Sequence, residues 1–78
     1  MNEEIFNRVK KVLYKHFGQI EVKYDTVAKD VDGWDSLTHI KIINDIQSEF
    51  NIKFTMPDLR SFSCVGKIVD CLERKLNQ

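Results

Sequence analysis

Apolar side chains recur at the three- and four-residue spacing of an amphipathic helix in three stretches of the chain, residues 2–17, 36–50 and 65–76. Polar and charged residues fill most of the positions between them. The repeating positions are Ile5, Val9, Val12 and Leu13, then Leu37, Ile40, Ile43 and Ile46, then Val65, Ile68, Val69, Leu72 and Leu76. The pattern therefore predicts three longer helices, each with one buried face.

Residues typical of helix ends stand at the borders of these stretches. Asn2 is suited to cap the first helix, and Gly18 to end it. Asn51 is a plausible left-handed stop for the second helix. Thr55 is suited to cap a short additional helix, and Ser63 to cap the last one. The sequence therefore predicts an all-α fold, a small four-helix bundle with three longer helices and one short helix.

A long connection, residues 19–35, separates the first two predicted helices. Its apolar residues Ile20, Val22 and Tyr24 alternate with polar ones, which predicts an extended segment pinned by its apolar side chains. Val27 and Val31 lie four apart, and we expect a helical turn there that plugs one end of the core. Connections of this length are often functional in small domains.

The composition predicts one globular domain of 78 residues, with 42% hydrophobic and 31% charged residues. No apolar run approaches the length of a membrane-spanning helix, and the first residues lack the pattern of a signal peptide. We therefore expect a cytoplasmic monomer. Cys64 and Cys71 are spaced unlike a zinc site, and Cys71 fits a buried helix face. Neither a metal site nor a disulfide is expected.

Charge is distributed unevenly although the net charge is zero. Residues 1–24 and 59–78 each carry +2, whereas residues 25–58 carry −4. An acidic central segment argues against nucleic acid binding, which needs clustered Lys and Arg, and suggests a partner with a basic surface. Lys41, Asp45 and Glu49 are spaced to line one exposed stripe of the second helix, where we expect them to pair with each other.

Ser36 lies where the long connection becomes the second helix. A hydroxyl at such a junction can cap the helix by accepting a backbone N–H. It can also be presented to another molecule, because the first turn of a helix favours a phosphate. The spacing alone leaves both roles open. A catalytic triad of Ser36, His39 and Asp35 would lack an oxyanion hole and a substrate cavity, so the sequence does not favour an enzyme.

The segment Gly33-Trp34-Asp35-Ser36-Leu37, followed by Ile40, Ile43, Ile46, Glu49 and Phe50, resembles the Asp-Ser-Leu signature of acyl carrier proteins and peptidyl carrier domains. Phe54, Leu59 and the segment 63–69 resemble the boundary between the third and fourth helices of that family. The similarity covers nearly the whole chain in length, helix order and serine position.

The resemblance implies that Ser36 receives 4′-phosphopantetheine from coenzyme A through a phosphopantetheinyl transferase, while also holding the cap position. The thiol of this arm would carry an acyl or aminoacyl group as a thioester between a loading enzyme and later biosynthetic enzymes. The residues expected to face these partners are Asp35, Leu37, Ile40, Lys41 and Asn44. For Leu37 and Ile40, packing in the core remains an equal alternative. The residues expected to line the interior are Ile43, Ile46, Leu59, Phe62, Ile68 and Leu72.

One departure from the family concerns charge. Fatty-acid carriers are strongly acidic along the second helix, whereas this chain has Thr38, Lys41, Gln47 and Ser48 there. The departure favours a specialised pathway (polyketide, nonribosomal peptide or surface polymer) over general fatty acid biosynthesis, because electrostatics sets partner choice. The alternative function is a small helical adaptor that binds a protein partner without any covalent modification.

Overall fold

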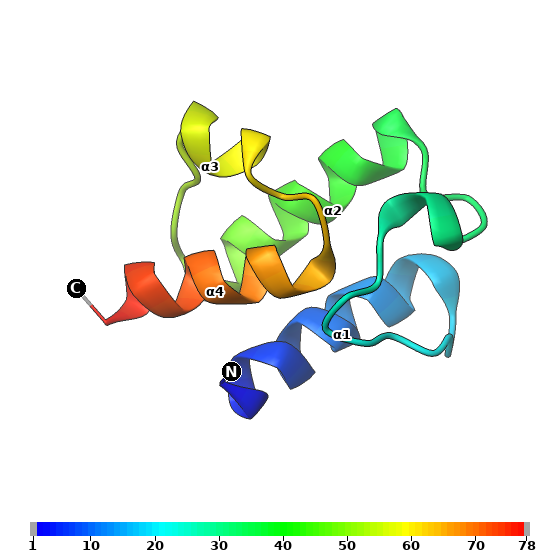
Figure 1. Ribbon diagram of the computed structural model, residues 1–78, viewed down its shortest axis with the longest axis horizontal. Coiled ribbons are helices and arrows are strands. Elements are labelled where there is room, and N and C mark those ends of the chain that lie inside the picture. Colours follow the sequence, from blue (N-terminus) through cyan, green and yellow to red (C-terminus); the bar gives the residue numbers. More distant parts are fainter. Residues whose placement is uncertain (1, 78) are drawn as a thin grey trace.

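Residues 2–77, which the computed structural model describes, fold into four α-helices and one short 3-10 helix (Figure 1). The elements in order are α1 (Glu3–Phe17), η1 (Ala28–Asp30), α2 (Ser36–Phe50), α3 (Met56–Arg60) and α4 (Val65–Leu76). No strand occurs between residues 2 and 77. The predicted all-α fold, with three longer helices, one short helix and a long first connection, is confirmed.

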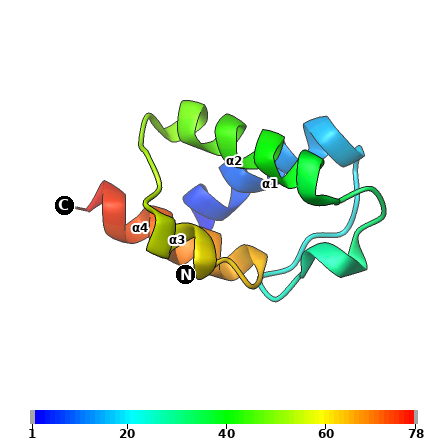
Figure 2. The same ribbon diagram turned by 90° about the horizontal axis from the view of Figure 1, so that it is seen from above.

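The core lies where α1 packs against both α2 and α4 (Figures 1 and 2). The largest fully buried side chains are Leu13, Ile42, Ile46, Leu72, Val9, Val65, Val69 and Cys71. Burial of one such aliphatic side chain stabilises the fold by about 1.5–3 kcal/mol relative to exposure. Among the predicted interior residues, Leu59 and Phe62 are only half-buried, because the short α3 covers the core incompletely.

Several predicted helix ends are confirmed. The side chain of Asn2 accepts a first-turn N–H of α1, and Gly18 ends the helix with φ of +74°. Asn51 ends α2 in the left-handed conformation, with φ of 54° and ψ of 48°. Thr55 caps α3 and forms a reciprocal capping box with Asp58. Local sequence chemistry therefore sets these ends.

The start of α4 differs from its prediction, since Ser63 does not cap the helix. Within residues 2–77 no side chain caps α4. Instead, the N–H of Val65 donates to the carbonyl of Thr26 at 2.9 Å, and that of Gly66 donates to the carbonyl of Tyr24 at 2.6 Å. The long connection thus satisfies the first turn of α4, and the same two bonds hold the connection in place.

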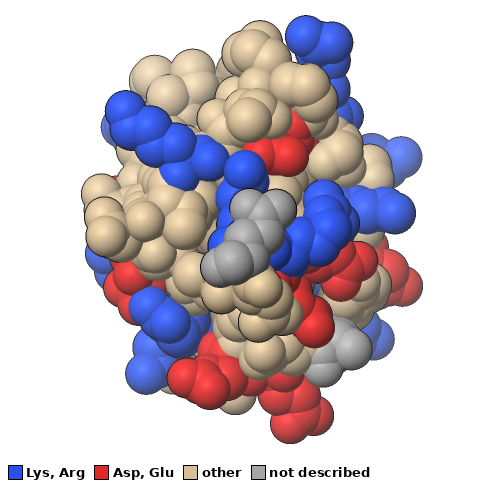
Figure 3. Space-filling view, turned by 90° about the vertical axis from the view of Figure 1, so that its left-hand side faces the viewer, with Lys and Arg blue, Asp and Glu red and all other residues tan. Residues whose placement is uncertain are grey.

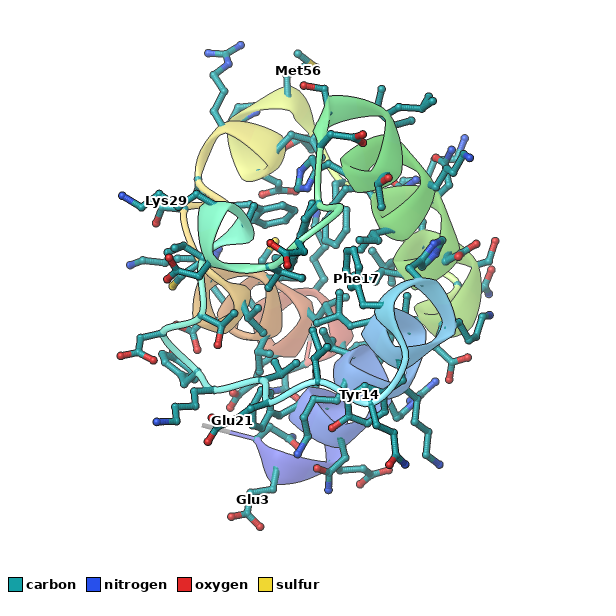
Figure 4. The ribbon with its side chains drawn as sticks, turned by 90° about the vertical axis from the view of Figure 1, so that its right-hand side faces the viewer. Glu3, Tyr14, Phe17, Glu21, Lys29 and Met56 are labelled. Atoms are coloured by element: carbon teal, nitrogen blue, oxygen red, sulfur yellow. The ribbon has the colours of Figure 1, made fainter. Side chains whose placement is uncertain are left out.

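The long connection runs along the bundle before it turns into η1. Val22 is buried, and Val27 and Val31 flank η1 and are half-buried, so the predicted turn is present. In Figure 4, Phe17 points from the end of α1 toward the centre of the molecule, whereas Lys29 points from η1 toward solvent. None of the helices between residues 2 and 77 is long and apolar enough to cross a membrane.

An ion pair and a hydrogen bond join α1 to α2. Arg8 Nε lies 3.0 Å from Glu49 Oε2, and His16 Nε2 lies 2.7 Å from Asp45 Oδ2. The prediction that Asp45 and Glu49 pair with Lys41 along α2 is wrong, because the packing of the two helices turns both acids toward α1. Both acids are thereby drawn away from the outward face of α2.

Candidate functional site

The turn before α2 is built by Gly33 and Trp34. Gly33 has φ of +87°, a conformation that side-chain-bearing residues rarely adopt. The backbone N–H of Trp34 then donates to the carbonyl of Val31 at 3.2 Å. These features aim the chain into α2 and leave Asp35 and Ser36 at its first turn.

Asp35, not Ser36, caps α2. The Asp35 backbone is extended, and its Oδ1 accepts the N–H of Thr38 at 2.8 Å. This hydrogen bond holds the pKa of the Asp35 carboxyl below its usual value, so the cap is ionised at neutral pH. The expectation that Ser36 holds the cap position is therefore wrong, because the residue before it fills that role.

Ser36 is the first residue of α2 and is exposed to solvent. Within residues 2–77 its hydroxyl makes no hydrogen bond, and neither do the backbone N–H groups of Ser36 and Leu37. The hydroxyl thus stands free at the positive end of a 15-residue helix. A phosphodiester attached to this oxygen would lie beside unpaired N–H donors, so the residues present fit such a group.

Trp34 and His39 pack together beside this serine. The indole Nε1–H of Trp34 donates to His39 Nδ1 at 3.0 Å, and the two rings stack with their centroids 6.0 Å apart. Partial burial lowers the pKa of His39, which keeps the imidazole neutral and able to accept this bond. No triad forms, since Asp35 bonds Thr38 and His39 bonds Trp34.

A surface groove runs along these side chains. Its lining residues are Ala28, Trp34, Asp35, Ser36, His39 and Ile40. Apolar surface from η1, from the connection before α2 and from α2 itself therefore lies next to the unbonded hydroxyl of Ser36. This arrangement suits the attachment of a flexible organic group more than catalysis.

Comparison with known proteins agrees with this geometry. Residues 30–72 match the family model described as "Phosphopantetheine attachment site". A protein of Thermotoga maritima named "Acyl carrier protein" is 40% identical over 76 residues, which span 95% of this chain and 94% of that protein. The chain belongs to the acyl carrier protein family. Its function is to carry acyl groups on a phosphopantetheine arm, and it is a carrier, not an enzyme.

The carrier displays its second helix largely as the family resemblance implied. Leu37 is 62% exposed and Ile40 is 57% exposed, so the alternative of core packing is wrong for both. Lys41 and Asn44 are also exposed. Asp35, at the cap directly before the serine, is exposed as well.

The Trp34–His39 pair is the feature of this site that sequence reasoning missed. Once Asp35 is the cap, Trp34 precedes the cap and His39 is the fourth helical residue. Side chains at these two positions commonly pack together as a hydrophobic staple. Placing the cap one residue too late, at Ser36, concealed this relation.

Proposed function

We propose that Ser36 is the residue that receives the phosphopantetheine arm. Four serines lie in the segment matched to the family, namely Ser36, Ser48, Ser61 and Ser63. The Ser61 hydroxyl donates to a carbonyl at 2.7 Å, and Ser63 precedes a helix whose first N–H groups are already bonded. The observation that carries the proposal is the exposed, unbonded hydroxyl of Ser36 at the start of α2. When attached, the arm supplies a thiol that carries the acyl group as a thioester.

The partner-docking surface, in this proposal, consists of Asp35, Leu37, Ile40, Lys41 and Asn44. Two of these side chains are large, apolar and exposed, and the two charged ones have opposite signs. The other acids of α2 are engaged with α1. Partners, including the phosphopantetheinyl transferase and the loading enzyme, would therefore dock chiefly through apolar contact, with little long-range attraction.

This charge pattern also supports a specialised biosynthetic pathway. Figure 3 shows Lys and Arg interspersed with Asp and Glu on the face at the left of Figure 1, so the side of the molecule away from the start of α2 adds no strong acidic field to the docking surface. The acidic segment 25–58 led us to expect a partner with a basic surface, but two of its acids, Asp45 and Glu49, contact α1, so attraction to such a surface is weaker than the charge of the segment suggests. We therefore favour polyketide, nonribosomal peptide or surface-polymer assembly over general fatty acid biosynthesis.

Arm attachment is tested with coenzyme A and a broad-specificity phosphopantetheinyl transferase. Mass spectrometry should show a gain of about 340 Da on the unaltered chain. Ser36→Ala should abolish the gain, whereas the matched control Ser63→Ala should retain it. No gain on the unaltered chain, or a gain that persists in Ser36→Ala, would contradict the proposal, and the first result would favour an unmodified adaptor.

Docking is tested by the rate of the same transfer. Leu37→Ala and Ile40→Ala should slow it, and added salt should change it little, because screening weakens only charge attraction. A steep fall in rate with salt would contradict apolar docking.

A further inference from the structure

Acidic and basic side chains differ in their surroundings along α2 and α3. Each acid between residues 36 and 62 lies within 3.0 Å of a side-chain nitrogen from α1 or α4. These acids are Asp45, Glu49 and Asp58. The Lys and Arg side chains of the same segment are exposed, and within residues 2–77 they form no ion pair. They are Lys41, Lys53 and Arg60. The charge that remains free to face a partner is therefore positive.

Lys41 and Lys53 lie along the outward face of α2. One stripe of this helix, at intervals of three or four residues, consists of Leu37, Lys41, Asn44 and Ser48. A surface hollow at the end of α2 is lined by Asn44, Ser48 and Lys53. The stripe thus runs from an exposed leucine in the first turn to two free ammonium groups.

The short helix α3 also carries an exposed apolar side chain and a free cation. Met56 is 61% exposed, and Figure 4 shows it at the top of the molecule, the side on which α2 begins. Arg60 lies four residues later, on the same side of α3. Exposed apolar side chains and unpaired cations therefore occur together on both helices.

The chain before Ser36 carries the opposite charge. Residues 28–35 contain one base, Lys29, and three acids, Asp30, Asp32 and Asp35, which gives −2. All four side chains are exposed, and no ion pair within the described residues includes them. Ser36 therefore stands at the boundary between a negative segment and a positive helix face.

Charges arranged in this way act mainly at close contact. Beyond about 8 Å salt screens each charge at physiological ionic strength, and the two halves also offset each other, so the net attraction stays small. On contact, a like charge placed against either half is unfavourable. The pattern therefore selects one direction of docking over the reverse.

We propose that this polarity fixes the direction in which an enzyme docks. The matching enzyme surface places carboxylates against Lys41 and Lys53 and a cation against the segment before Ser36, on either side of an apolar contact. This inference rests on the proposed docking surface and names the chemistry of the partner that fits it. A partner that is basic along the whole of α2 would meet both lysines as like charges.

The test uses isotope-labelled, unmodified protein and a synthetic amphipathic helical peptide as the probe. One face of the peptide carries leucines, and its polar face carries lysines in one half and glutamates in the other. A nitroxide label at either end broadens the amide NMR signals of the residues that lie near it. The lysine end should lie near residues 30–36 and the glutamate end near residues 41–53. The preference over the reverse direction should be about fivefold, as two surface ion pairs give.

Charge reversal on two different helices supplies the control. The double variant Lys41→Glu, Lys53→Glu should lose the preference, because its positive half has become negative. The matched variant Lys11→Glu, Lys15→Glu makes the same charge change at exposed positions of α1 and should keep the preference. Melting curves followed by circular dichroism establish that both variants fold, and the unaltered protein decides the matter even if one of them does not.

The outcomes separate the polarity from the proposed function. Equal broadening from the two labels, or the reverse order, overturns the polarity alone. Absence of binding, or binding that Leu37→Ala does not weaken, overturns the docking surface and the polarity together. Arm attachment to Ser36 is measured separately by mass spectrometry. Sedimentation of the free protein tests a different occupant, since a dimer that Lys41→Glu disrupts would assign the surface to a second copy of the chain and overturn the inference.

Discussion

Gly66 at the start of α4 is the position where a single added methyl group should be felt most sharply. A Cβ built on Gly66 would lie 2.3 Å from the ring of Tyr24. The exposed ring can turn aside only by giving up the hydrogen bond that its hydroxyl donates to Asp70, while the Tyr24 carbonyl, which accepts the N–H of Gly66 at 2.6 Å, holds the backbone in place. Tyr24 thus contacts α4 through both its hydroxyl and its backbone.

The cost of Gly66→Ala follows from two opposing effects. Inserting a methyl group into an occupied space costs about 1–3 kcal/mol. Alanine in a helix gains up to about 1 kcal/mol over glycine. We expect a net destabilisation of about 1–2 kcal/mol, which lowers the melting temperature of a domain of this size by roughly 5–15 °C.

A double-mutant cycle identifies the ring as the cause. In a Tyr24→Ala background the clash is gone, and Gly66→Ala should become neutral or stabilising by up to about 1 kcal/mol. In a Tyr24→Phe background the ring remains, and Gly66→Ala should still destabilise. Urea unfolding followed by circular dichroism measures each free energy. An equal cost of Gly66→Ala in the Tyr24→Ala and unaltered backgrounds would refute the reasoning.

Three further predictions concern charged and capping groups. Asp35→Ala should lower the melting temperature by roughly 5 °C through loss of the α2 cap, as followed by circular dichroism. Lys75 and Thr55 lower the pKa of Asp58 in the folded state, so ionised Asp58 stabilises the fold above about pH 4, and this stabilisation is lost as the pH falls further. Lys75→Met should therefore reduce the loss of unfolding free energy between neutral and acidic pH, as measured by urea unfolding. The hydrogen bond to Asp70 raises the pKa of Tyr24 to about 12, so Asp70→Asn should lower the pKa of Tyr24. Tyrosinate absorbance measures this pKa in a Tyr14→Phe background, where Tyr24 is the single tyrosine.

Sequence periodicity predicted the helices well because burial imposes it directly. The positions that repeat in α1 and α4 lie in the core, with the exception of Leu76, which is exposed at the end of α4. In α2 the apolar residues outnumber the positions that the core can cover, since Ile42, Ile43 and Ile46 fill it and leave Leu37 and Ile40 exposed. Periodicity alone cannot divide such a helix into a buried face and an exposed one.

The start of α4 and the contacts of Asp45 and Glu49 with α1 show why local patterns fail elsewhere. Ser63 is a good capping residue, but carbonyls of Tyr24 and Thr26, some 40 positions earlier in the chain, accept the helix N–H groups first. Asp45 and Glu49 have a partner in the correct spacing on their own helix, yet the rotation of α2 against α1 brings His16 and Arg8 closer. Both outcomes depend on how distant segments pack.

The misplaced cap at α2 bears directly on the proposed carrier site. Aspartate and serine are both strong capping residues, and here they are adjacent, so sequence preference could not separate them. In the structure the carboxylate of Asp35 stabilises the helix, and the hydroxyl of Ser36 takes no part in it. Attachment of an arm to Ser36 would therefore cost no capping bond, and the negative arm would lie at a helix end whose stability is already provided for. Under the proposed attachment, stability and modification fall to neighbouring side chains, so the arm can be added to Ser36 without loosening α2.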